Sequence, residues 1–447
     1  MLFLSRSMKS NTTFPDHYKT TLKQLKMKKV LLFLLTVLYL PSFAQFNRWF
    51  EDKTLRLDYY HNGNHKQEVY SFDELLEEPF WGGSKKNLID TLQYGNYFFK
   101  VFDDSSDLLI YSRGYSSLFF EWQTTPEADT VWRSFEESVV FPFPKKPVKV
   151  VLYKRTWKGK WKKMMTCHVD PSDYFIKKDR RLVYPVFDVW KSGEPEQRVD
   201  IVILPEGYTE QEMGRFIADC QKFKNEFFSF SPYKENKDRF NIRAVLAPSR
   251  ESGTDIPAEG VWRSTMLNTS YYTFNSERYL MTYDYKRVRD LAANAPYDQI
   301  YILVNSPKYG GGAIYNYYNV GVNSNRQAGK ILVHEFGHGF AGLGDEYYND
   351  DTYGEIYNTK IEPWEPNLTT LKHFDKKWLH LVPDTVPIPT PDIEKYKHVV
   401  GAFEGGGYMP KKIYRPVHDC LMKTFNGDKF CPVCSEAIQK MIDFYSN

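Results

Sequence analysis

The sequence predicts an α+β protein in two parts, an antiparallel β-sandwich followed by an α/β domain. Its 447 residues exceed what one compact core usually takes. Up to about residue 170, short apolar runs rich in Val, Tyr and Phe alternate with turn residues, which is typical of a sandwich. After residue 198 the pattern changes to strand–helix–strand. We expect a sandwich over 45–171, a linker over 172–197 and an α/β domain over 198–447.

The composition is that of a soluble globular protein. Hydrophobic residues make up 42% and charged residues 26%, which excludes wholesale disorder. The net charge of +3 comes from the N-terminus, because residues after 44 carry 52 Lys and Arg against 55 Asp and Glu. This balance does not favour a nucleic acid or an anionic membrane as a partner.

The N-terminus has the pattern of an export signal. It begins with two lysines at 28–29 and continues with an apolar run from Val30 to Leu40. Small residues at Ser42 and Ala44 then mark a cleavage site. We expect a signal peptide over 27–44, preceded by a non-native extension over 1–26. The apolar run is short for a membrane span, so the mature protein has no stable span and is periplasmic, cell-surface or secreted.

The first part shows candidate strands but no cluster of catalytic residue types. The apolar runs at 98–103, 117–122, 138–143 and 148–155 are predicted strands. Prolines around residue 144 suit sheet edges and turns. A packing or binding module is the simplest interpretation.

The second part contains buried strands and amphipathic helices. Strands are predicted at 198–205, 240–248 and 297–305. Thr209 and Glu212 form a capping-box pattern that opens a helix. Residues 310–320, with three glycines, are expected to form an edge strand, and 327–343 a helix.

That last helix carries the sequence His334-Glu335-Phe336-Gly337-His338. Two histidines four residues apart lie on one face of a helix, so both imidazoles can bind one cation. Zinc lowers the pKa of a bound water, and Glu335 is placed to take its proton as the water attacks a carbonyl. Gly337 and Gly339 are unfavourable in a helix, which indicates that another segment or a substrate approaches closely.

A catalytic zinc ion needs a third protein ligand and one open position. Asp345 and Glu346 follow a glycine turn and are the candidates. We prefer Asp345, because its shorter side chain is positioned at a lower entropy cost.

Three of the five cysteines lie close together near the C-terminus. In an oxidising compartment, a disulfide from Cys420 to Cys431 or Cys434 is the leading interpretation. A second zinc site of His418, Cys420, Cys431 and Cys434 is the alternative.

The segment HEFGHGFAGLGDEYY (334–348) resembles the active-site signature of the immunoglobulin-A peptidase family of zinc metalloendopeptidases, a metzincin-like branch of the zincins. The resemblance extends over most of the mature chain. It implies a zincin catalytic domain with one catalytic Zn²⁺ held by His334, His338 and Asp345, and Glu335 as general base. It also implies that Met422 forms a methionine turn beneath the metal.

The zincin analogy also assigns roles in substrate binding. An extended peptide could add to the edge strand at Gly311, Gly312, Ala313 and Ile314. Tyr414 is a candidate stabiliser of the transition state, although simple packing is the more common role of such a tyrosine.

The sequence therefore predicts an exported zinc endopeptidase that acts on a protein or peptide. A zinc amidase or deacetylase acting on glycans is one alternative. A glycan- or protein-binding protein with a vestigial metal site is another, but the intact His334, Glu335 and His338 count against it. A monomer is plausible, and the oligomeric state is left open.

Overall fold

The structure is a computed structural model that describes residues 42–348, 357–427 and 429–446. The expected extension and nearly all of the expected signal peptide lie outside these residues. Helix α2 (Ser42–Trp49) is the first described element. None of the described helices is both long enough and apolar enough to cross a membrane.

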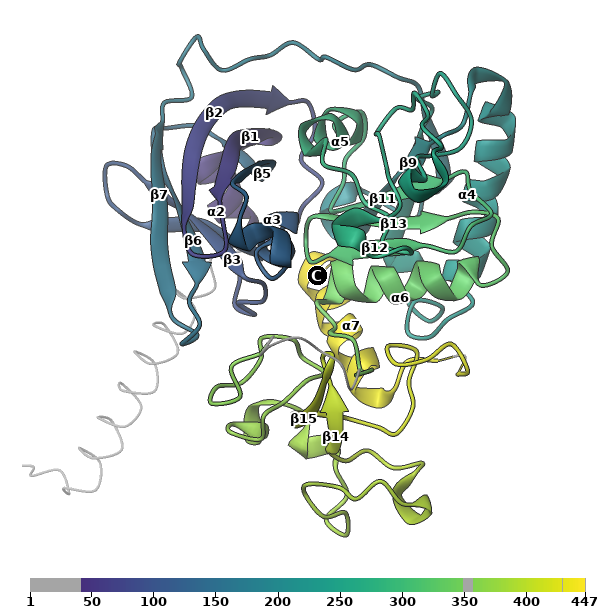
Figure 1. Cartoon of the computed structure of the whole chain (residues 1–447). Coiled ribbons are helices and arrows are strands. Elements are labelled where there is room, and N and C mark those ends of the chain that lie inside the picture. Colours follow the sequence, from purple (N-terminus) through teal and green to yellow (C-terminus); the bar gives the residue numbers. More distant parts are fainter. Residues whose placement is uncertain (1–41, 349–356, 428, 447) are drawn as a thin grey trace, which may run out of the picture.

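The first part consists of two antiparallel sheets that face each other (Figure 1). One sheet has the order β2-β1-β5 and the other β4-β3-β6-β7. The inner faces meet in a hydrophobic core, where the rings of Phe99 and Phe141 lie 6.3 Å apart. The expected antiparallel sheets are thus confirmed. The strands are β1 (Phe50–Gly63), β2 (Glu68–Glu78), β3 (Tyr97–Asp103), β4 (Leu109–Tyr115), β5 (Arg133–Pro144), β6 (Val148–Arg155) and β7 (Trp161–Val169).

One of the predicted strands is wrong. Residues 117–122 form the short helix α3 (Leu118–Trp122), with Ser117 extended before it. Leu118, Phe119 and Trp122 are buried, at spacings that fit one helix face. A short apolar run cannot be assigned from periodicity alone, and here the burial on one helical face decided its conformation.

The second part is built on a six-stranded mixed sheet of order β12-β13-β11-β9-β10-β8. Neighbours from β13 to β10 are parallel, and β12 and β8 pair antiparallel at the two edges. The edge strand β8 lies within the segment expected to be a linker, so the prediction is wrong there. Its sequence VFDVW is mostly apolar, but only Val189 of its five residues is buried. The strands are β8 (Val186–Trp190), β9 (Val199–Glu206), β10 (Phe240–Val245), β11 (Gln299–Val304), β12 (Gly311–Ile314) and β13 (Tyr318–Val322).

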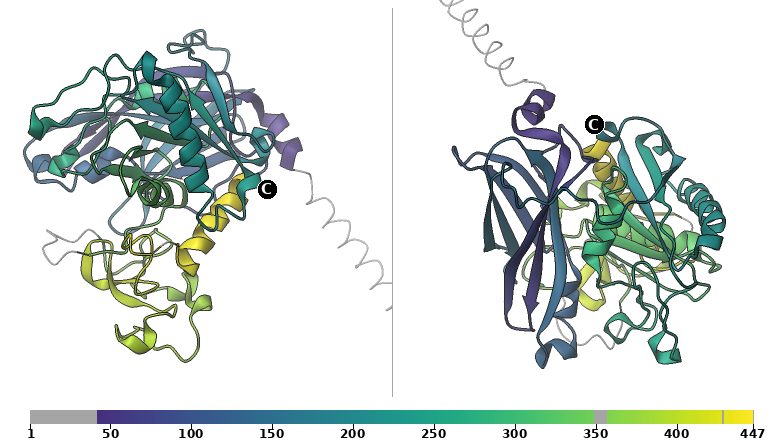
Figure 2. Two further views of the ribbon diagram at one scale, coloured as in Figure 1. Left: turned by 90° about the vertical axis from the view of Figure 1, so that its right-hand side faces the viewer. Right: turned by 90° about the horizontal axis from the view of Figure 1, so that it is seen from above.

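Helices cover both faces of this sheet (Figures 1 and 2). On one face, α4 (Met213–Phe227), α6 (Ala328–Ala341) and α7 (Pro432–Ser446) share a core with alternate residues of the central strands. On the other face, α5 (Tyr285–Ala292) and α3 pack in a second core. Because α3 comes from the first part, the two parts share this second core.

Helix α4 is preceded by the capping box that the sequence predicted. The backbone N–H of Thr209 donates to the Glu212 carboxylate at 2.9 Å. The backbone N–H of Glu212 donates to the side chain of Thr209, which completes the box. A short 3-10 turn (Glu210–Glu212) then leads into α4. The box thus satisfies the backbone N–H groups of Thr209 and Glu212 at the start of this turn.

Between α6 and α7 the chain forms a lobe with little regular structure, drawn below the sheet in Figure 1. Its main element is a hairpin of β14 (Phe403–Gly406) and β15 (Met409–Arg415). This lobe brings residues from beyond position 400 to the face of α6.

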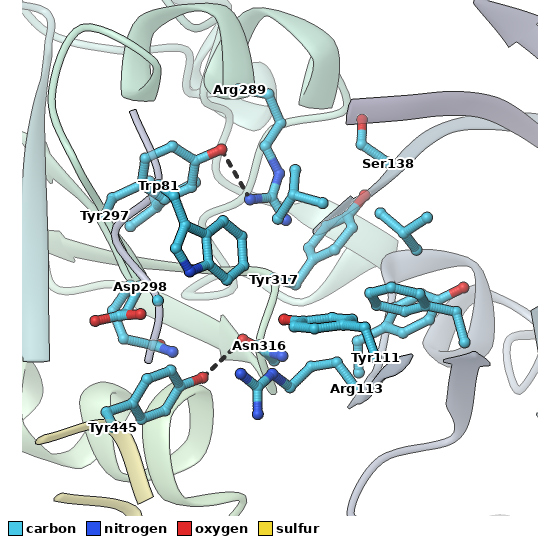
Figure 3. Close-up of a pocket in the computed structure, with 17 residues that line it drawn as sticks. Trp81, Tyr111, Arg113, Ser138, Arg289, Tyr297, Asp298, Asn316, Tyr317 and Tyr445 are labelled. Carbon is cyan, nitrogen blue, oxygen red and sulfur yellow. Dashed lines mark hydrogen bonds between the residues drawn. The ribbon is translucent and has the colours of Figure 1, made fainter. Parts of the chain in front are cut away.

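The two parts also meet through a buried polar network. Arg56 of β1 is almost fully buried and contacts Asp58, Glu78 and, at 2.8 Å, Asp290 of α5. Loss of one partner from such a buried network would leave an uncompensated charge, which is strongly destabilising. Next to it, a cavity lies between the parts (Figure 3). Its lining includes Trp81, Tyr111, Arg113, Arg289, Tyr297, Asp298 and Tyr445.

Close approach explains Gly337 and Gly339 in α6. A Cβ at Gly339 would lie 2.0 Å from Oδ1 of the buried Asn319 on β13, and one at Gly337 would lie 3.1 Å from the sulfur of Met422. The prediction that another segment approaches α6 at these glycines is confirmed.

We expect Gly339→Ala to lower the free energy of unfolding by about 1–3 kcal/mol, because overpacking outweighs the gain of about 1 kcal/mol in helix propensity. Urea denaturation measures this change. The matched control is Gly214→Ala in α4, where a Cβ meets nothing within 4 Å and no loss is expected. Equal stability of the two variants would contradict the packing argument.

Candidate metal centre

Helix α6 places His334 and His338 side by side. The helix packs against β12 and β13 and ends at Gly342, whose φ of +64° reverses the chain. A left-handed residue of this kind is the usual helix C-cap and favours glycine. The turn brings Asp345 back towards the two histidines.

Three ligand atoms converge at this point. The Nε2 atoms of His334 and His338 lie 3.1 Å apart, and each lies 3.3 Å from Oδ1 of Asp345. These atoms form one of the groups of His, Cys, Asp and Glu whose spacing suits a metal ion. Asp345, rather than Glu346, is therefore the acidic residue that the structure brings to the histidines.

The hydrogen bonds of the histidines show which nitrogens face the centre. Nδ1 of His334 lies 3.0 Å from the carbonyl oxygen of Leu421, and Nδ1 of His338 contacts that of Leu343. A carbonyl only accepts, so each Nδ1 carries a proton and each Nε2 is the nitrogen that faces the centre. Oδ1 of Asp345 is buried and has no hydrogen-bond donor. Two imidazole nitrogens and a carboxylate oxygen at this spacing suit a metal cation.

The carboxylate of Asp345 is held in place by the lobe after α6. The hydroxyl of Tyr408 donates to Oδ2 of Asp345, and the backbone N–H of Gly407 donates to its carbonyl at 2.8 Å. The preceding Gly344 is held by two hydrogen bonds to the side chain of Asn367. Tyr408 was not found by sequence reasoning, because it is 63 positions from Asp345 and belongs to no recognisable motif.

Neighbouring charges keep the carboxyl group of Asp345 ionised. Burial acts to raise the pKa of Asp345, but the charge of His338 beside it holds that pKa well below its usual range. Burial acts to lower the pKa of His338, but Asp345 raises it to about 9. Burial raises the pKa of Glu335, with the two histidines opposing. A carboxyl with a raised pKa is suited to accept a proton near neutral pH.

Strand β12 lies beside Glu335. A Cβ at Gly311 would come within 3.2 Å of a carboxylate oxygen of Glu335, so glycine leaves the space open. The strand is at the edge of the sheet, as expected, but residues 310–320 form the β12–β13 hairpin rather than one strand. At Gly311 the outer edge is already occupied, because its N–H and carbonyl bond to Arg278 and Leu280. Peptide addition there is ruled out, whereas Gly312, Ala313 and Ile314 stay as predicted substrate contacts.

The chain around Met422 lies beneath the histidines. Met422 is fully buried, its sulfur faces Gly337, and its carbonyl accepts a hydrogen bond from the backbone N–H of Glu346 at 2.8 Å. The adjacent carbonyl of Leu421 orients His334. The 420–422 segment thus supports both ends of the ligand set, in the place where a methionine turn is expected.

Among the described residues no contact joins Tyr414 to the ligand set, and its role in the transition state stays a prediction. Tyr414 lies on β15, where its backbone pairs with Thr369, and its side chain packs at the margin of the core. Burial raises its pKa. The tyrosine that contacts the ligand set is Tyr408, because the β14–β15 turn brings its hydroxyl to Asp345.

The first part of the chain also reaches the centre. Glu121 of α3 accepts a hydrogen bond from Tyr279, and burial raises its pKa to about 7, while the charges of His338, Asp345 and Glu335 act on it. Sequence reasoning missed this residue because it lay in a run assigned to a strand.

The cysteines do not form the expected disulfide. All five lie within the described residues and are free, and Sγ of Cys420 is 3.9 Å from that of Cys434. A disulfide needs about 2.05 Å between sulfurs. His418 of the alternative zinc site lies elsewhere, 3.2 Å from Asp392. In its place, Glu346 joins Cys420, Cys431 and Cys434.

Comparison with known proteins identifies both parts. The family model described as IgA Peptidase M64 matches residues 187–397 and 392–442, and that described as Peptidase M64 N-terminus matches residues 45–166. A search of curated proteins finds no match. The two family matches together cover most of the described chain. The protein therefore belongs to the IgA peptidase M64 family and is a metallopeptidase.

Proposed function

We propose that this protein is an exported zinc endopeptidase in which His334, His338 and Asp345 bind the catalytic ion and Glu335 is the general base. The observation that carries this proposal is the convergence of the two Nε2 atoms and Oδ1 of Asp345 at a spacing that suits a metal ion. Two imidazoles and a carboxylate are ligands that zinc prefers in catalytic sites.

A zinc ion bound there would act as a Lewis acid that makes a water molecule acidic enough to attack a peptide carbonyl. The protein residues transfer the proton and orient the ligands. Glu335, next to His334 on α6, accepts the proton of the attacking water and passes it to the leaving amine. Leu421 and Leu343 hold the imidazoles through their carbonyls, and Tyr408 holds Asp345. Such outer contacts keep ligands oriented for binding.

The finer assignments rest on the same geometry. The burial of Met422 under α6 supports a metzincin-like methionine turn. The position of β12 at the edge of the sheet supports binding of an extended peptide, which a glycan deacetylase would not need. Export is proposed from the lysine-preceded apolar run at residues 28–44.

Cleavage of a peptide library, with sequencing of the products, tests the proposal. We expect internal peptide bonds to be cut, the activity to disappear after treatment with the chelator 1,10-phenanthroline, and zinc to restore it. The matched control is 1,7-phenanthroline, which cannot chelate a metal. Activity that survives removal of all metal, or release of single terminal residues only, would contradict a zinc endopeptidase.

A further inference from the structure

We propose that Glu346, Cys420, Cys431 and Cys434 form a second metal site, which binds a structural zinc ion and braces the ligands of the first. The four ligand atoms lie within 4.8 Å of one another, and all four residues are buried. They come from three places in the chain. Glu346 follows the turn after α6, Cys420 opens the turn that supports His334, and Cys431 and Cys434 lie at the start of α7.

The sulfur separations fit a zinc ion better than a disulfide. In a tetrahedral site with Zn–S bonds of about 2.3 Å, two sulfurs are roughly 3.8 Å apart. Sγ of Cys420 and Sγ of Cys434 are separated by 3.9 Å. The spacing of two residues between Cys431 and Cys434 is also the usual one for a zinc-binding cysteine pair.

The surrounding backbone favours thiolates at this point. The N–H of Cys431 lies 3.3 Å from the sulfur of Cys420, and the N–H of Cys434 lies 3.4 Å from the sulfur of Cys431. Each of these bonds uses sulfur as an acceptor. Outer hydrogen bonds to ligand atoms are a regular feature of metal sites.

Glu346 provides the independent observation. Its side chain is fully buried; Oε1 lies 3.0 Å from the amide nitrogen of Asn367 and 3.1 Å from the sulfur of Cys434, and Oε2 has no hydrogen-bond partner. A buried carboxylate oxygen without a partner costs free energy. Arg415 does not hydrogen-bond to it, because its Nη1 donates to the carbonyls of Glu404 and Gly405, and its Nε and Nη2 reach no hydrogen-bond acceptor among the described residues. A cation bound among the three sulfurs would interact with this Oε2 atom.

The proposed ion is structural, because four protein ligands leave no open position for water or substrate. Its ligands adjoin those of the first site. Glu346 follows Asp345 directly, and Cys420 precedes Leu421, whose carbonyl orients His334. The N–H of Glu346 also bonds to the carbonyl of Met422. The second site therefore joins the two chain segments that position the first.

Metal analysis of the purified full-length chain and its variants tests this inference. We expect about two zinc equivalents in the wild type and about one in His334→Ala/His338→Ala, held by the cysteines. Cys431→Ser/Cys434→Ser should lose the second equivalent, whereas Cys167→Ser, a thiol outside the cluster, should keep both. Cobalt substitution adds a direct readout, because thiolate-to-cobalt absorption in the near ultraviolet should persist in the histidine variant and vanish in the double cysteine variant.

The histidine variant keeps the test decisive even if the cysteine variant fails to fold. The inference is overturned if that variant contains no metal, if its cobalt form lacks the thiolate absorption, or if mass spectrometry finds a disulfide among the three cysteines. None of these readouts depends on peptidase activity. A wild type that holds the thiolate-bound ion but cuts no peptide would contradict the proposed function alone.

Discussion

Glu335→Gln should lower kcat for peptide cleavage by about 100- to 10,000-fold, the usual contribution of a general base. The amide has nearly the shape of the carboxylate but cannot accept the proton of the attacking water. Glu335 does not belong to the group of His334, His338 and Asp345, whose three ligand atoms converge. We therefore expect the metal content to equal that of the wild type, and Glu335→Ala to behave in the same way.

Steady-state kinetics on a cleaved peptide, with metal analysis of the same preparation, checks this result. Glu335→Asp is the matched variant, since it keeps the carboxylate but withdraws it by one methylene. It should retain part of the activity. Full activity in Glu335→Gln would exclude Glu335 as the base, and loss of metal would make it a ligand instead.

Asp345→Ala should remove the catalytic ion and with it essentially all peptidase activity. Asp345 is the one anionic member of the set with His334 and His338, and its Oδ1 lies 3.3 Å from both Nε2 atoms. Changes in outer partners of metal ligands already cost about 10- to 100-fold in affinity, so loss of a direct ligand should cost at least as much. Dialysis followed by metal analysis should find one equivalent fewer than in the wild type.

Asp375→Ala is the matched control for Asp345→Ala. Asp375 lies on the exposed surface of the same lobe, in a short 3-10 turn, and its loss should leave the metal content unchanged. Retention of the full metal content in Asp345→Ala would show that another residue completes the site.

The general architecture could be predicted from the pattern of apolar and turn residues, because strands and helix starts depend on local residue order. Alternating apolar runs predicted the antiparallel sheets, and Thr209 with Glu212 predicted a helix start that the structure confirms. The sequence pattern gave the wrong secondary structure for segments that bury only one face or few of their residues. Residues 117–122 became a helix that fills the core shared by the two parts, and the short run VFDVW within the expected linker became the edge strand β8.

Within the site, the helical spacing of His334 and His338 already required their rings to share a face, since four residues make about one turn. The same holds for Glu335 as their neighbour. The acidic ligand could not be decided in this way, because Asp345 and Glu346 are adjacent and follow the same glycine turn. Their side chains diverge, one towards the histidines and the other towards Cys434.

Local sequence thus accounts for the helix, the pair of imidazoles and the neighbouring base, all of which follow from one helical repeat. Long-range packing decided which carboxylate joins them, that Tyr408 rather than Tyr414 contacts it, and that Glu346 lies with three free cysteines. The reason is that these contacts join segments 60 to 90 positions apart, and their geometry arises only when the lobe after α6 folds back beneath that helix.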